Sequence, residues 1–266
     1  WVFIKGLFMG RTYGEGVVQI ICPAPSLGYS FQEHSCVTSL ISEALPVTLS
    51  LAIGALALWL IVGVGLGVLA AKNRGRFVDS ASTVFVLIGT SLPTFLTGLM
   101  LLVFVVIKWH ILPFPAGNYT PFLENPFEWA QILFLPWVTL AFAYAALYTR
   151  FVRSAVIETS NEDYIRTARA KGLPESVVLS KHTLRAALAP IVTMAGLDFA
   201  GLLGGAILTE SVFNLPGLGR LAISAVREYD LPIIVATTLL AAAIVVIMNL
   251  IVDILYAFID PRVRVA

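Results

Sequence analysis

The sequence predicts an all-α integral membrane protein, and the prediction depends on its composition and on five long apolar runs. Hydrophobic residues make up 58% of the 266 positions and charged residues only 12%, whereas soluble domains are roughly half apolar and a quarter charged. This excess of apolar residues is too large for one soluble core, so a lipid bilayer is the expected solvent. A net charge of +1 provides no basic field for binding nucleic acid.

Each apolar run is long enough to cross a bilayer, because about 30 Å of hydrocarbon takes roughly 20 helical residues. The runs cover residues 45–71, 80–107, 129–149, about 186–209 and 231–252. The first two contain no charge, the fourth contains only Asp198, and the last continues past Asp253. Proline inside several runs is compatible with spanning helices, since neighbouring helices satisfy the freed backbone groups. We therefore expect five membrane helices.

Lys and Arg are distributed unequally between the connections, and cytoplasmic loops carry the excess. Twelve lie on one side: Lys72, Arg74, Arg76, Arg150, Arg153, Arg166, Arg169, Lys171, Lys181, Arg185, Arg262 and Arg264. Five lie on the other: Lys5, Arg11, Lys108, Arg220 and Arg227. The first side is the expected cytoplasmic side, which places the C-terminus inside and residue 1 outside.

An external start requires a translocated segment before it, yet residues 1–20 show no signal-peptide pattern. We therefore expect a further N-terminal helix preceding Trp1, with residues 1–42 as the external segment that follows it. Both cysteines, Cys22 and Cys36, fall in this segment, where oxidation is permitted. A disulfide between them and a pair of free thiols are equally compatible with the sequence.

The motifs of common enzymes and metal sites are absent from the sequence. There is no G-x-x-x-x-G-K-[ST] phosphate loop, no G-x-S-x-G elbow and no H-E-x-x-H pair. The three histidines, at positions 34, 110 and 182, are far apart and none has a second ligand at metal spacing. We expect no catalytic residue, no metal and no cofactor in this chain, which fits a path through the membrane better than a catalyst.

Asp198 lies near the middle of the fourth run, where a charge is costly unless it is paired or hydrated. It is a candidate for lining an aqueous path or contacting a substrate amine, and the alternative is a structural acid that hydrogen-bonds a neighbouring helix. Glu210 and Asp253 lie close to the ends of runs, where water is within reach. Gly63 and Gly67 are four residues apart, as are Gly201 and Gly205, a spacing that favours close helix packing within the chain. The alternative is a dimer face, especially around Gly201, Gly204 and Gly205.

Residues 150–185 form a basic connection much longer than two helices need. Asn161 is a plausible N-cap of a first short helix, Gly172 has the position of a left-handed C-terminal residue, and Pro174 stands where a second helix can start. Topology and lipid headgroups explain the positive charge. They do not explain the helix–Gly–Pro–helix layout, which is typical of a docking element for a cytoplasmic partner.

Four stretches resemble one family of transporters. They are "GTSLPTF" (89–95), "DYIRTARAKGL" (163–173), "TESVFNLPGLGRL" (209–221) and "DILYAFIDPRVR" (253–264). Together they resemble the B-type dipeptide and oligopeptide permeases of ABC importers. The general EAA pattern of importer permeases, E-A-A-x-x-x-G followed by I-x-L-P, is matched at Ala168 and Gly172. Arg166 stands where that pattern has its Glu, and Arg185 where it has its Pro.

The resemblance implies the fold of a type I ABC importer transmembrane domain over residues 43–266, with a cytoplasmic coupling (EAA) loop at about 158–186. It implies as partners a homologous second permease, two cytoplasmic ATPases that hold ATP and Mg, and an external solute-binding protein. The residues it places in the ATPase contact are Tyr164, Arg166, Ala168, Arg169, Gly172 and Leu173. Those it places in the external loop near the binding-protein dock are Glu210, Asn214, Pro216, Gly217 and Gly219.

The expected function is that of a permease subunit of an ATP-driven importer for di- or oligopeptides in the bacterial inner membrane. It would form half of the translocation path and couple to an ATPase through residues 162–182. A secondary transporter or channel working alone is the main alternative, and it would be expected to show paired intramembrane charges or inverted repeats. A structural or assembly subunit is a third. The sequence does not select among dipeptides, longer peptides, haem, nickel complexes and glutathione.

Overall fold

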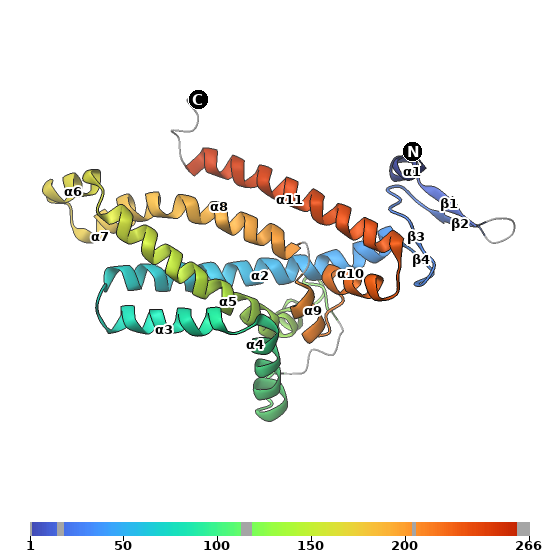
Figure 1. Ribbon diagram of the computed structural model, residues 1–266, viewed down its shortest axis with the longest axis horizontal. Helices are drawn as coiled ribbons and strands as arrows, with labels where there is room; N and C mark the ends of the chain where they lie inside the picture. Colours follow the sequence, from blue (N-terminus) through green and yellow to red (C-terminus); the bar gives the residue numbers. More distant parts are fainter. Residues whose placement is uncertain (1, 15–18, 113–118, 204–205, 260–266) are drawn as a thin grey trace.

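A computed structural model describes residues 2–14, 19–112, 119–203 and 206–259, and it shows a bundle of long helices with two small β-hairpins at one end (Figure 1). Three helices have the length and composition to cross a membrane: α2 (Val37–Lys72), α5 (Pro126–Ser160) and α11 (Leu231–Ile259). Two bent pairs raise the candidate spans to five. The prediction of an all-α membrane fold is confirmed.

The first bent pair shows that the apolar run over residues 80–107 is not one continuous helix. Helix α3 (Phe77–Ser91) ends before Pro93, and the following helix turns away by 100°. Figure 1 shows this second part, α4 (Thr94–Leu101) with the π-helical η1 (Leu102–Lys108), leaving the bundle sideways. Proline has no backbone N–H and disfavours helical geometry in the residue before it, which explains the break. The 15 residues of α3 are about 22 Å long, short of the hydrocarbon thickness.

The second bent pair begins in the basic connection. Helix α6 (Asp163–Ala170) is followed by a continuous stretch made of α7 (Glu175–Val177), η2 (Val178–Thr183) and α8 (Leu184–Leu203). It bends at Pro190, the one proline inside α8. Helix α8 is described as far as Leu203, and the end of the run predicted to reach residue 209 includes positions outside the described residues. Two short helices, α9 (Ile207–Val212) and α10 (Leu218–Arg227), lead from there to α11.

The N-terminal segment folds against the end of the bundle that carries α10. After α1 (Val2–Met9), strands β1 (Arg11–Tyr13) and β2 (Ile20–Cys22) form one antiparallel hairpin, and β3 (Tyr29–Ser30) and β4 (Ser35–Cys36) form another. Cys22 and Cys36 form a disulfide that joins the two hairpins directly before α2 begins. Buried Ser30 donates a hydrogen bond to buried Asp230, which fixes the second hairpin to the start of α11.

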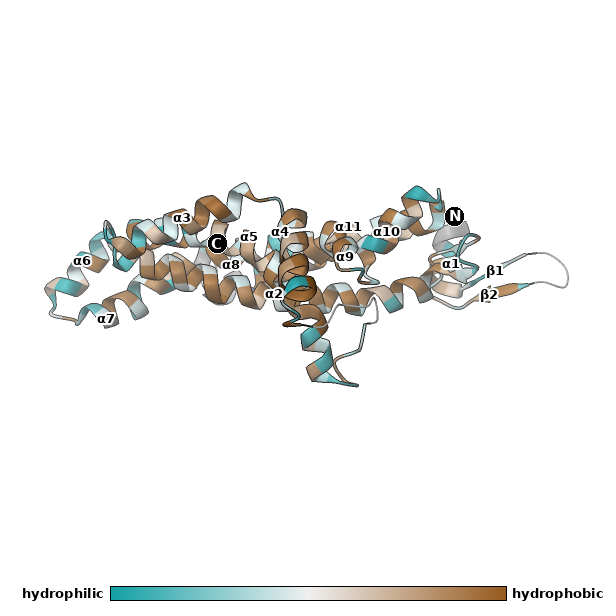
Figure 2. Cartoon of the chain, turned by 90° about the horizontal axis from the view of Figure 1, so that it is seen from below, coloured by the Kyte–Doolittle hydropathy of each residue, from teal (hydrophilic) through white to brown (hydrophobic). Residues whose placement is uncertain are grey.

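Many of the hydrophilic residues lie at the two ends of the bundle. Figure 2 shows apolar residues along the middle of the helices, with hydrophilic residues at α6, at the end near α10 and around the part that projects at α4. In Figure 1 the α2–α3 turn and α6 lie at one end, and the N-terminal hairpins lie at the other. The connections that carry Lys72, Arg74 and Arg166 are thus together, as the topology from the charge distribution requires.

We expect the Cys22→Ser, Cys36→Ser double variant to expose the N-terminal hairpins to proteolysis. The disulfide closes a loop with a sequence separation of 14, and a loop of about 15 residues is stabilised by about 3 kcal/mol. The measurement is the rate of limited proteolysis of the purified permease, followed by mass spectrometry of the cleavage sites. Wild-type protein treated with reductant is the matched comparison and should behave like the variant. Equal cleavage rates in the oxidised wild type and the variant would contradict this role.

Candidate functional sites

The coupling segment lies at the far end of the bundle, beyond the α2–α3 turn (Figure 1). Helix α6 begins after Glu162, which is its N-cap and makes no side-chain capping hydrogen bond, so the prediction of Asn161 as the N-cap is wrong. Gly172 has φ +78, the left-handed conformation predicted for it, and no atom within 4 Å of the position where a Cβ would be. A second helix, α7, does start directly after Pro174, which is its N-cap. The turn is therefore exposed and defined by its backbone geometry.

Two sets of contacts hold α6 against the helix that follows it. Ile165 and Val178, both fully buried, form a small apolar cluster with Ala168. Arg169 makes a two-pronged ion pair with Glu175, through Nε to Oε2 at 3.0 Å and Nη2 to Oε1 at 2.8 Å, and this raises the pKa of Arg169. A third donor, Nη1 of the same guanidinium, reaches the carbonyl oxygen of Ser160 at 3.1 Å.

The six residues predicted for the ATPase contact divide into two groups. Tyr164 and Leu173 are 48% and 38% exposed, and Arg166 is exposed with one loose ion pair to Asp163 at 3.6 Å. Ala168 is buried, and Arg169 is engaged by the contacts just described. The first three form the outward surface of the segment. The other two, with the turn at Gly172, give it a fixed shape.

Asp198 lies on α8 and its Oδ2 accepts a hydrogen bond from the Tyr148 hydroxyl of α5 at 2.6 Å. Tyr148 is buried and packs beside Trp59 of α2, whose ring also stacks on Tyr144 with centroids 4.6 Å apart. Asp198 itself is only partly buried. The contact joins two helices, and the residue stays a candidate for the translocation path.

Glu210 fastens the loop between α8 and α10 to α2. Its side chain is fully buried, which corrects the expectation that water is within its reach. Oε1 accepts from the Thr48 hydroxyl of α2 at 2.7 Å, and Oε2 accepts from the backbone N–H of Arg220 at 2.9 Å. The same Thr48 oxygen accepts from the N–H of Leu218 at 2.8 Å. A carboxylate at the start of α10 also complements the helix dipole, and burial raises the pKa of Glu210.

The glycines of the external loop are explained by this arrangement. A Cβ on Gly217 would overlap the Glu210 carboxylate, and one on Gly219 would lie 2.9 Å from the Cα of Ile207. Asn214, at φ +54, and Pro216 are exposed. Only these last two of the five predicted dock residues therefore present a surface, while the other three shape the loop.

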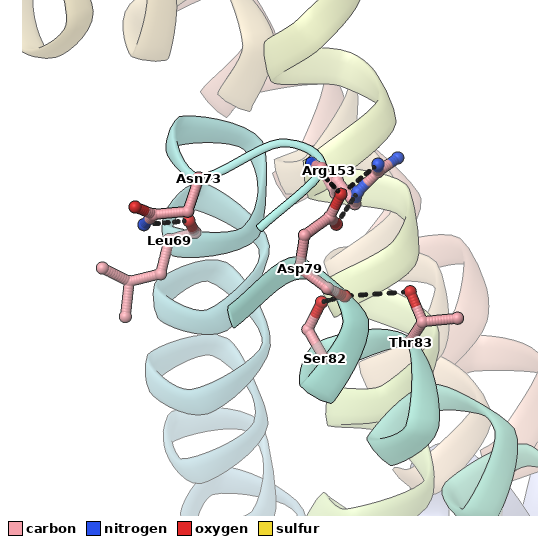
Figure 3. Close-up of polar contacts among 7 residues, drawn as sticks. Leu69, Asn73, Asp79, Ser82, Thr83 and Arg153 are labelled. Carbon is pink, nitrogen blue, oxygen red and sulfur yellow. Dashed lines mark hydrogen bonds and ion pairs between the residues drawn. The ribbon is translucent and has the colours of Figure 1, made fainter. Parts of the chain in front are cut away.

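An ion pair between α3 and α5 was not predicted from the sequence (Figure 3). Asp79 is buried, and its carboxylate accepts from Arg153 through Nε at 2.6 Å and Nη2 at 2.9 Å. It also accepts from the N–H of Gly75, at φ +74, at 2.9 Å, which closes the α2–α3 turn. The available signal was an acidic residue in the first turn of a helix, directly after the basic residues of a cytoplasmic loop.

Among the residues that the structure describes, no group of three or more His, Cys, Asp and Glu side chains is arranged to hold a metal ion.

The chain matches two family models that together cover most of its length. Residues 63–265 match the "Binding-protein-dependent transport system inner membrane component" family, and residues 1–52 match the corresponding N-terminal domain.

Several curated relatives are similar to this chain over most of its length. A putative peptide transport system permease protein of Brucella abortus is 41% identical over 240 residues, which is 90% of this chain and 75% of that protein. The oligopeptide transport system permease protein AppB of Bacillus subtilis is 41% identical over 232 residues, 86% of this chain and 72% of that protein.

Solved structures share the fold at low sequence identity. The inward-facing MetNI methionine ABC transporter gives a TM-score of 0.65 at 18% identity, covering 84% of this chain and 97% of that chain. An amino acid ABC transporter crystallised with histidines gives a TM-score of 0.58, also at 18% identity, covering 85% of this chain and 94% of that chain.

We expect Gly217→Ala to prevent stable folding of the external loop, because the added methyl group collides with Glu210 and removes the helix cap. The measurement is the melting temperature of the purified permease in detergent. Gly65→Ala in α2 is the control, since a Cβ there meets nothing within 4 Å. Equal melting temperatures for the two variants would rule out the packing described here.

We expect Asp79→Asn to lower the melting temperature as well, because it replaces the two-pronged ion pair of Arg153 with a single neutral acceptor. Asp163→Asn is the matched control: its ion pair with Arg166 is long and both side chains are exposed, so its loss should change nothing measurable. A drop of the same size in both variants would show that burial of the Asp79 pair contributes nothing specific.

Proposed function

Because this chain belongs to the family of binding-protein-dependent transport system inner membrane components, we propose that it carries di- and oligopeptides across the bacterial inner membrane as half of an ABC importer. It is a multi-pass permease subunit and not an enzyme, since ATP binding resides in the ATPase partners of such transporters. The observation that supports the peptide class best is 41% identity over 90% of the chain to a peptide permease protein.

The coupling segment is the part that we propose to contact an ATPase. A short helix held by a two-pronged ion pair and a buried apolar cluster is rigid enough to transmit a displacement. Its outward residues, Tyr164, Arg166 and Leu173, would form the contact, and Arg169 and Gly172 would set the angle of the helix. Helix α5 extends from this segment along α2 to the level of α4 and α9 (Figure 1).

The remaining partners follow from the same proposal. A homologous second permease would complete the path, two ATPases would bind at the end that carries α6, and a solute-binding protein would dock at the opposite end near Asn214 and Pro216. In this orientation the C-terminus is cytoplasmic and the N-terminal hairpins are external. Asp198, at the level of Trp59 and Tyr148, would lie along the path.

The proposal is tested by purifying the chain from its native membranes in mild detergent and identifying what accompanies it by mass spectrometry. A second permease, ATPases and a solute-binding protein are the expected companions. The reconstituted complex should then import labelled peptides in an ATP-dependent manner. Recovery of the chain alone, or only with copies of itself, would contradict the proposal and favour a channel or secondary transporter.

We expect Gly172→Pro to uncouple ATP hydrolysis from peptide uptake, because proline cannot adopt a positive φ and the angle of α6 would be lost. Gly172→Asn is the matched control, since asparagine tolerates the left-handed conformation. The measurement compares ATP hydrolysis and peptide uptake in proteoliposomes that contain the complete transporter. Wild-type uptake by the proline variant would remove the turn from the coupling element.

A further inference from the structure

The carboxylate of Asp198 lies at a depth where a charge needs a partner. Asp198 is the single charged residue of the apolar run 186–209 and stands near the middle of that run, and its hydrogen-bond donor is Tyr148 of α5. A run of this length is what a bilayer-spanning segment requires, so the carboxylate is expected within the apolar layer. Ionisable residues at such a depth face the bundle interior or a water-filled cavity, not lipid.

The hydrogen bond from Tyr148 engages only one of the two oxygens of the Asp198 carboxylate. The Tyr148 hydroxyl donates to Oδ2, whereas no described residue donates a hydrogen bond to Oδ1 and none forms an ion pair with Asp198. Tyr148 is only 2% exposed, and its ring is held beside Trp59, so it cannot turn away. The hydrogen bond thus fixes the direction of the carboxylate and leaves one oxygen without a described partner.

Aromatic rings from two helices stand next to this carboxylate. Trp59 is fully buried and stacks on Tyr144, which is partly exposed and lies one helical turn before Tyr148 on α5. Asp198 is also partly exposed. The accessible surface at this point therefore combines a carboxylate oxygen with the edge of an aromatic cluster, and aromatic faces and carboxylates both attract cations.

We propose that Asp198, together with Tyr144, binds the N-terminal ammonium group of the peptide as it passes through the membrane. This inference rests on the proposed peptide-import function. An ammonium group offers three donors for the unused oxygen and is small enough to approach a ring face. Tyr148 acts as a positioning residue, because it holds the carboxylate and does not itself touch the peptide.

Transport by variants gives the first test, in proteoliposomes with the complete transporter and with Ala-Ala as substrate. Asp198→Asn should lower the maximal uptake rate about tenfold or more, as expected for loss of a hydrogen bond to a charged group. Asp198→Glu keeps the charge and should retain most of the uptake. Asn and Glu variants with wild-type uptake would overturn the inference while leaving the import function intact. Wild-type proteoliposomes that import no peptide would instead overturn the proposed function.

Covalent trapping gives a readout that does not depend on transport or on folding of a variant. Dicyclohexylcarbodiimide enters membranes and couples a carboxylate to an amine in contact with it. With wild-type transporter and isotope-labelled Ala-Ala amide, mass spectrometry should find the peptide attached at Asp198. The N-acetylated peptide should not attach, because its ammonium group is blocked. Attachment of neither peptide, or of label elsewhere but not at Asp198, would overturn the inference.

Discussion

Helices α2 and α5 pack closely only because α2 has glycine at the positions that face large side chains of α5. A Cβ on Gly63 would lie 2.7 Å from the Cβ of Tyr148, and one on Gly67 would lie 2.6 Å from the Cβ of Val152. Lipid tails are as apolar as the side chains, so helices in a bilayer associate through close packing and not through exclusion of water. The two glycines make that packing possible, and the other helices are arranged around this pair.

Three polar contacts connect the α2–α5 pair to the rest of the bundle. Thr48 of α2 binds Glu210 toward the end that carries α10, Tyr148 of α5 binds Asp198, and Arg153, five residues further along α5, binds Asp79. Each one attaches a different element: the α9–α10 loop, α8 and α3. A polar group without a partner in such surroundings costs several kcal/mol by order of magnitude, so each contact also specifies which helix must lie there.

The sequence predicted those structural features that depend on residues close to one another in the chain. Run length predicted where the spanning helices lie, because a bilayer demands about 20 apolar residues, and the spacing of Gly63 and Gly67 predicted packing within the chain. The left-handed turn at Gly172 and the helix start after Pro174 also depend on neighbouring residues only. The bend at Pro93 was available in the sequence, but the unbroken apolar run concealed it. The hydropathy of a run indicates how long an apolar segment is, but it does not indicate where its helix bends.

Contacts between segments that are distant in the chain could not be predicted from the sequence. Glu210 seemed to lie near water because it follows the end of an apolar run, yet 162 positions separate it from the Thr48 that binds it. Asp79 and Arg153 are 74 positions apart, and each alone resembles an ordinary residue of a cytoplasmic loop. Asp198 was identified because its depth alone is unusual, whereas its partner Tyr148 could not be selected from eight tyrosines.

The arrangement of these contacts determines which parts of the bundle can move together. Helix α5 is continuous from Pro126 to Ser160 and packs on α2 without room between them, so the two helices behave as one body. By contrast, an open apolar groove of about 550 Å³ lies between α2, α8 and α11. Side chains that line an open groove lack close-packed neighbours on that side, so these helices have room to shift. A displacement of α6 would be passed to both α5 and α8, and the hydrogen bond from Tyr148 to Asp198 connects these two helices within the bundle.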